Sequence, residues 1–137
     1  MFGRDDFEWQ RLIEAGTAFL VEQARLRRTT TYTEMDATLA RRTGLRRFDF
    51  SQVEERAAIG ELLGRIVRSD IARTAYADGP LMLSALVMYL NENDAGTGFY
   101  VLAEELGLLS PGATRMSKER FWIDQVTLLQ AHYAAPR

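Results

Sequence analysis

The sequence predicts a mainly helical α+β fold, built as a single domain over residues 1–137. Apolar residues recur at helical spacing through most of the chain, and helix start and stop residues bound these stretches. Only two short segments favour extended backbone, and no linker or repeat divides the chain. With 47% hydrophobic and 26% charged residues, 137 residues are enough for one buried core.

The first helix is predicted from Asp5 to about Arg28. Asp5 followed by Glu8 is the pattern of a capping box, in which each residue satisfies a free backbone amide of the other. The stretch Thr29–Thr33 is β-branched, which favours a short extended segment after this helix. The apolar stripe of the helix comprises Trp9, Leu12, Ile13, Gly16, Phe19 and Leu20.

Two further helices follow on either side of a short link. The second is predicted to open at Thr31, with Glu34 as its capping partner, and to end at Gly44 in the left-handed conformation. The third is predicted to open at Ser51, with Glu54 as its reciprocal cap, and either to break near residues 69–70 or to continue to about residue 76. Its core face comprises Ile59, Leu62, Leu63, Ile66 and Val67.

The second half of the chain is predicted to hold a strand and two helices. The Leu, Met and Ala residues of the apolar run Met82–Leu90 also favour a helix, with Pro80 at its first position. A polar turn rich in Asn, Asp and Gly follows at once, which favours a buried strand followed by a turn. A fourth helix is expected over Gly98–Leu106, ended by Gly107, and a last helix opens at Ser117. The core face of the last helix comprises Trp122, Val126, Leu129 and Tyr133.

The side-chain inventory argues against an enzyme. The chain has no cysteine and one histidine, His132, so a thiolate metal site, a cysteine nucleophile and a usual zinc ligand set are all excluded. The acidic pairs at 54–55 and 104–105 are sequence neighbours, which point about 100° apart on a helix and cannot share a proton or a metal. We expect no catalytic residue, no cofactor and no metal.

The ends and the hydropathy pattern predict a cytoplasmic protein that does not enter the membrane. The segment "MFGRDDFEWQ" has acids where a signal peptide needs basic and apolar residues. The longest apolar run, residues 81–90, is about half the length of a bilayer span.

Positive charge is concentrated in one part of a chain whose net charge is −2. Residues 25–47 carry seven arginines against two acids, a local field that could steer a polyanion. Codon bias toward arginine and the preference of cations for helix C-termini explain the same pattern without any function. The candidate nucleic-acid contacts are Arg41, Arg42, Arg46, Arg47, Gln52 and Arg56.

The order helix, short strand, helix, turn, helix, strand, turn is that of a winged helix. The winged-helix-like core would cover about residues 30–107, with flanking helices at about 5–28 and 117–133. In that arrangement the helix that begins near Ser51 reads the major groove of double-stranded DNA. Glu54 and Glu55 on its opening turn oppose this prediction, because each would repel a phosphate.

A strip of small residues follows on the same helix. Arg56, Gly60 and Gly64 recur at four-residue spacing, which leaves a flat surface. Small residues at this spacing favour a close contact between two helices. The alternative is that the strip lets a phosphate backbone approach closely.

The layout of residues 30–107 resembles the DNA-binding domain of alkylguanine transferases and alkyltransferase-like proteins. The resemblance rests on "TYTEM", "ERAAIGELLGRI", "GPLMLSALVMYL" and "GTGFYVLAEELG". It implies that Arg56 corresponds to the arginine that is inserted where a base is flipped out. The family's Pro-Cys-His-Arg is replaced by Pro80-Leu81-Met82-Leu83, so the resemblance implies no alkyl transfer. Parts of these segments are also similar to small bacterial proteins of no known activity.

The alternative to nucleic-acid binding is a protein–protein interaction module, such as an antitoxin, an immunity protein or a complex subunit. Four aromatic residues on the terminal helices could form an interaction patch for a partner or for a homodimer. They are Trp9, Phe121, Trp122 and Tyr133. Phe121 and Trp122 are adjacent on a helix and cannot face one seam together.

Overall fold

The computed structural model describes residues 1–88 and 96–134. Within these ranges the chain is mainly helical, with one small sheet, which confirms the predicted fold class. The helices are α1 (Asp6–Arg25), α2 (Tyr32–Thr43), α3 (Val53–Arg73), α4 (Thr97–Glu105) and α5 (Arg115–Tyr133). A 3₁₀ turn, η1 (Leu83–Leu86), and the strands β1 (Thr30–Thr31) and β2 (Val87–Met88) complete the described structure.

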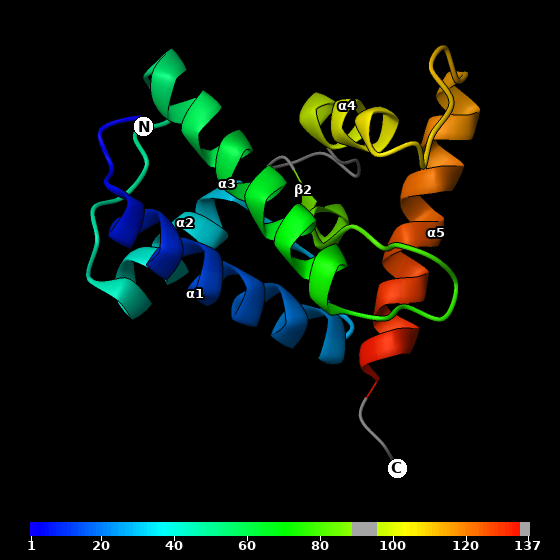
Figure 1. Cartoon of the computed structure of the whole chain (residues 1–137), viewed down its shortest axis with the longest axis horizontal. Coiled ribbons are helices and arrows are strands. Elements are labelled where there is room, and N and C mark those ends of the chain that lie inside the picture. The colour runs from blue at the N-terminus through cyan, green and yellow to red at the C-terminus, as the bar shows by residue number, and fades with distance from the viewer. Residues whose placement is uncertain (89–95, 135–137) are drawn as a thin grey trace.

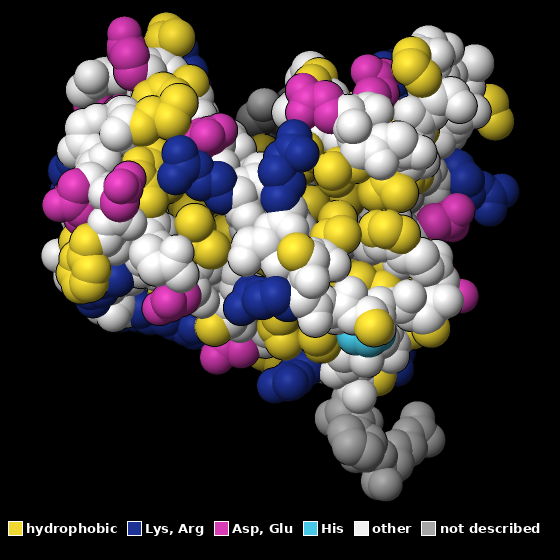
Figure 2. Space-filling view, viewed as in Figure 1, with side chains coloured by type: hydrophobic (Ala, Val, Ile, Leu, Met, Phe, Trp, Pro, Cys, Tyr) yellow, Lys and Arg dark blue, Asp and Glu magenta, His cyan; other side chains and the backbone are white. Residues whose placement is uncertain are grey.

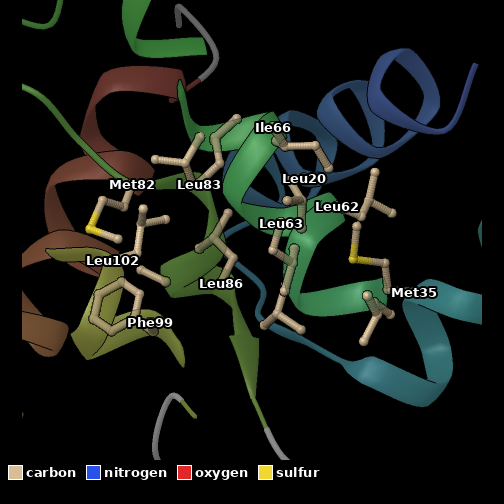
Figure 3. Packing of buried hydrophobic residues seen from close by; sticks show 14 of the residues in the cluster. Leu20, Met35, Leu62, Leu63, Ile66, Met82, Leu83, Leu86, Phe99 and Leu102 are labelled. Atoms are coloured by element: carbon tan, nitrogen blue, oxygen red, sulfur yellow. The ribbon is translucent and has the colours of Figure 1, made fainter. Parts of the chain in front are cut away.

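The core lies where α1, α2, α3 and η1 meet (Figure 1). In Figure 1, α1 and α3 run side by side, and α5 lies against α1 and η1. Leu20 of α1, Met35 of α2 and Ile66 of α3 are almost completely buried and point toward one another (Figure 3). Every residue predicted for the core face of the third helix is buried.

Local signals placed the start of α1 and both ends of α2 correctly, whereas α1 ends at Arg25, three residues before the predicted Arg28. The side chain of Asp5 accepts from the amide of Glu8 at 2.8 Å, and Glu8 accepts from the amide of Asp5 at 3.2 Å, so the capping box is formed. Thr31 caps α2 through the amide of Glu34 at 3.1 Å. Gly44 ends α2 with φ +71°, a conformation that favours glycine.

The predicted start of α3 at Ser51 is wrong. The hydroxyl of Ser51 donates to Asp49 Oδ1 at 2.6 Å, and the amide of Ser51 reaches the same oxygen at 3.1 Å. Because this hydroxyl is used by Asp49, the helix begins at Val53, and Gln52 makes no side-chain cap. Glu54 has no capping role there.

The predicted strand over Met82–Leu90 is also wrong for most of its described length. Residues 83–86 form the 3₁₀ turn, and only residues 87 and 88 are extended. The strands pair in parallel, Thr30 with Val87 and Thr31 with Met88, so the sheet joins segments on either side of α2 and α3. The predicted turn and wing at residues 91–95 lie outside the described residues, and the winged-helix arrangement stays a prediction.

The last two helices begin within two residues of their predicted starts, and α4 ends at Glu105, one residue before the predicted Leu106. α4 begins at Thr97 and ends before Gly107, whose φ of +74° fits the predicted stop. α5 begins at Arg115 rather than near Ser117, because Thr114 accepts from the amide of Ser117 as the cap. No helix of the described residues is long and apolar enough to cross a bilayer.

Candidate functional site

The arginines of residues 41–47 are largely used within the molecule. Arg47 Nε lies 2.9 Å from Asp36 Oδ2, a carboxylate that is 2% exposed and also accepts the Phe48 amide at 2.8 Å. The guanidinium of Arg42 lies 2.7 Å from the carboxylate of Glu22 and over the ring of Phe19, both on α1. Arg41 is exposed on the last turn of α2.

Glu55, which opposed the nucleic-acid prediction, holds the N-terminal segment in place. Arg4 Nη1 lies 2.8 Å from Glu55 Oε2, and Arg4 Nη2 lies 3.2 Å from Oε1. Arg46 Nη1 lies 2.9 Å from the same Oε1. The hydrogen bond from Arg4 is the main cause that lowers the pKa of Glu55 below its ordinary value, against the opposing effect of burial. Glu55 is therefore an internal counter-ion.

Three of the predicted nucleic-acid contacts do come together. Arg46, Arg47 and Gln52 line a hollow of about 420 Å³, but three acids line it with them. These acids are Asp49, Glu54 and Glu55. The chain's own carboxylates therefore share this loop with the arginines, and its role in binding a nucleic acid stays a prediction. Arg42 is held on α1 instead, and Arg56 donates to the carbonyl of Phe50 at 2.7 Å.

The predicted aromatic patch does not form as one exposed surface. Trp9 is 1% exposed, and its indole N–H donates to the carbonyl of Met1 at 3.0 Å. The indole N–H of Trp122 donates to the carbonyl of Ala85 at 2.8 Å, which ties α5 to η1. Phe121 and Tyr133 are half-buried, against Phe99 and Tyr76 respectively.

A cleft of about 420 Å³ opens between α3 and α4. Figure 2 shows the surface hollowed between these two helices. Apolar side chains from both helices line it, among them Leu63, Phe99 and Leu102. Its volume falls within the range of small-molecule sites. Charged and polar side chains line it together with the apolar ones.

The glycine strip of α3 forms one wall of this cleft. A Cβ atom added at Gly60 or Gly64 would meet none of the described residues within 4 Å. The expectation that this strip packs against a second helix is therefore wrong for the described part of the chain. The backbone of α3 is bare here, and the row continues to Arg56 at one end and Arg68 at the other.

The charged groups around the cleft are balanced. Arg68 of α3 lies 2.9 Å from Glu105 of α4, and Arg65 lies 3.2 Å from Glu61. All four side chains line the cleft. Among the described residues that line the cleft, two cations therefore face two anions, and their formal charges cancel.

Ser84 supplies the polar group at the inner end of the cleft. It lines the cleft, is 4% exposed, and its hydroxyl has no hydrogen-bond partner among the described residues. Thr97 and Gly98, at the first turn of α4, line the same space. The N-cap of α4 is Gly96, whose lack of a side chain means that it cannot cap the amides of this turn.

The sequence held partial signals for the cleft. Gly60 and Gly64 were identified as a strip, and Ser84 is the one polar residue in the apolar run 81–90. The sequence pattern does not mark Arg65, Arg68 and Glu105 as members of one site, because they meet only when α3 and α4 are placed opposite each other.

Comparisons with protein-family models, curated protein sequences and solved structures found no match to this chain. Among the described residues, no group of three or more His, Cys, Asp or Glu side chains is placed to hold a metal ion.

Proposed function

We propose that this chain is a non-enzymatic nucleic-acid-binding protein that uses the exposed row of α3, not the arginines of residues 41–47. The row consists of Arg56, Gly60, Gly64 and Arg68, spaced four residues apart. The bare glycine wall is the observation that carries the proposal, because no described residue covers it.

The row offers a backbone-binding geometry. Residues at four-residue spacing form a ridge inclined to the helix axis. The twelve-residue separation of the two arginines corresponds to about 18 Å along that axis. A guanidinium stands at each end, and guanidinium groups bind phosphates through two parallel hydrogen bonds. Two glycines between them allow a strand to approach the helix backbone closely.

The test is the salt dependence of oligonucleotide binding, measured by fluorescence anisotropy with a labelled 12-mer, as a single strand and as a duplex. Contacts from Arg56 and Arg68 to two phosphates predict a slope of log Kd against log salt concentration of about 2. Arg56→Ala and Arg68→Ala should each lower this slope by about 1. The pair of Arg68 with Glu105 is about half exposed on both sides, so its loss should change stability little.

Arg115→Ala is the matched control. Arg115 is on α5, its side chain is 94% exposed, and it too pairs with a glutamate, so the variant removes one positive charge of the same kind. It should leave the slope unchanged. An absence of binding at low salt, or a slope that none of the three variants alters, would contradict the proposal.

A protein-interaction module is the second candidate function. Met116 and Ile123, seven residues apart on α5, are 82% and 52% exposed. Two exposed apolar side chains at this spacing lie on one side of a helix. If a second copy covers them, Ile123→Glu should convert a dimer to a monomer in light scattering. A chain that is monomeric at high concentration without the substitution would count against this dimer.

A further inference from the structure

We propose that the cleft between α3 and α4 binds an uncharged, planar heteroaromatic ring, with Ser84 as the residue that recognises its edge. The proposal goes beyond contact with a nucleic-acid backbone, because the cleft can hold a ring whether or not the row on α3 binds phosphates. It rests on the shape of the cleft, its charge balance and its unpartnered hydroxyl.

The shape of the cleft favours a flat ligand. One wall is helix backbone, since neither Gly60 nor Gly64 projects a side chain. The apolar side chains of Phe99 and Leu102 come from α4, and Leu63 comes from α3 (Figure 3). A ring placed in this space can pack one face on bare backbone and bury its apolar surface against these side chains.

The charge balance of the cleft favours an uncharged ligand. An anion would face the carboxylates of Glu61 and Glu105, and a cation would face Arg65 and Arg68. Both ion pairs already satisfy these groups, at 3.2 and 2.9 Å. A charged ligand would lie beside groups of its own sign as well as groups of the opposite sign, whereas a neutral ring is repelled by neither.

The hydroxyl of Ser84 is a hydrogen-bonding group that a ligand in the cleft can use. A buried hydroxyl without a partner is unfavourable, so a ligand that bonds to it gains relative to one that does not. Thr97 and Gly98 of the first turn of α4 also line this cleft, and their N-cap, Gly96, has no side chain to occupy the amides of that turn. Hydroxyl and amide donors together select a ring with acceptor atoms on its edge.

Nucleobases have this chemistry, and they can come from two sources, a free nucleoside or an unpaired base in a strand. The experiment uses the fluorescent base 2-aminopurine in four forms: the free nucleoside, its 5′-monophosphate, a single-stranded 9-mer and the matching duplex. Each form is titrated with the full chain at 0.5 M salt, which weakens contacts to phosphates and leaves contacts in the cleft.

Binding of the free nucleoside, with the monophosphate no tighter, supports a free ring as the ligand. Binding of the single strand alone supports an unpaired base. A monophosphate that binds more than 10-fold tighter than the nucleoside overturns the neutral class, and binding of none of the first three forms overturns the proposal. If the row on α3 makes no phosphate contacts, the salt dependence of oligonucleotide binding is lost while nucleoside binding in the cleft is unaffected. The failure of one proposal can therefore be distinguished from the failure of the other.

Two variants locate the site. Gly64→Leu should weaken binding at least 10-fold, because its side chain has room to extend into the cleft and fill it. Ser84→Ala should weaken binding by about 5- to 10-fold. Since the alanine variant also removes an unpartnered buried hydroxyl, its melting temperature without ligand should equal or exceed that of the unmodified chain. Unchanged affinity in both variants would place the ring elsewhere and overturn the proposal.

Discussion

Replacing the two glycines on the open face of α3 with alanine should make the protein more stable. Glycine in a helix interior costs about 1 kcal/mol relative to alanine. At Gly60 and Gly64 nothing in the described structure repays that cost, because an added Cβ would meet no described atom within 4 Å. The double variant Gly60→Ala/Gly64→Ala is therefore expected to gain about 2 kcal/mol.

The magnitude can be converted into a melting temperature. The unfolding entropy of an average domain, about 2.1 cal/mol/K per residue, gives about 290 cal/mol/K for this chain. A gain of about 2 kcal/mol then corresponds to a rise of about 7 °C, which calorimetry or thermal circular dichroism can measure. Urea unfolding with an unchanged m-value would confirm that the native state is the one stabilised.

Gly16 of α1 provides the control. Replacing Gly16 with alanine gains the same helix propensity, but a Cβ atom there would lie 2.6 Å from Ile66 Cδ1 and 3.3 Å from Met35 Cε. Overpacking costs about 1–3 kcal/mol, so Gly16→Ala should be neutral or destabilising. If the α3 double variant lowers the melting temperature as much as the α1 variant does, the glycine wall is covered and the reasoning is wrong.

Three further predictions concern stability. Glu55→Gln should cost about 3 kcal/mol in urea unfolding, because Arg4 is left buried without its counter-ion. Since the pKa of Glu55 is lowered in the native state, its contribution to stability should be present above about pH 4.3 and fade as the pH falls below that value. The variant should lack this part of the dependence of stability on acid pH. Tyr76→Phe should cost about 1–3 kcal/mol in urea unfolding, because the Tyr76 hydroxyl donates to the buried carboxylate of Asp70. Burial and this bond raise the pKa of Tyr76, so ultraviolet titration should show it ionising at a higher pH than a free tyrosine. Gly44→Ala should cost about 1 kcal/mol in urea unfolding, since alanine is strained at φ +71°, and no loss would show that the cap relaxes.

The parts of the fold that were predictable from sequence are those decided by local chemistry. The capping pairs Asp5–Glu8 and Thr31–Glu34 involve residues three apart, so the pattern contains the whole interaction. Ser51 failed as a cap because Asp49, two residues earlier, takes its hydroxyl. Both possible roles of Ser51, as a cap of α3 and as a donor to Asp49, follow from neighbouring residues. The sequence does not show which of the two prevails.

The 3₁₀ turn at residues 83–86 was not predictable from its own segment. Gln125 accepts from the amide of Met82 at 2.7 Å, and Trp122 donates to the carbonyl of Ala85 at 2.8 Å. Side chains of α5, about 40 residues further along the chain, therefore satisfy backbone groups that a strand would have satisfied in a sheet. Long-range contacts of this kind leave no periodicity in the sequence.

The candidate site also has features that the sequence shows and features that depend on tertiary contacts. The sequence showed that arginines gather before α3, but their partners, Glu22, Asp36 and Glu55, are set by tertiary contacts. The cleft needs α3 and α4 to face each other, so only its glycine wall could be seen in advance.

The most direct test of the account is a nitrogen-15 NMR titration of the full chain with the single-stranded 12-mer. Glycine amides are resolved in such spectra, and the account predicts shifts at Gly60, Gly64 and Gly98, with Gly44 and Gly112 unmoved. Shifts confined to the loop of Arg46 and Arg47, or no shifts at any of these positions, would contradict it.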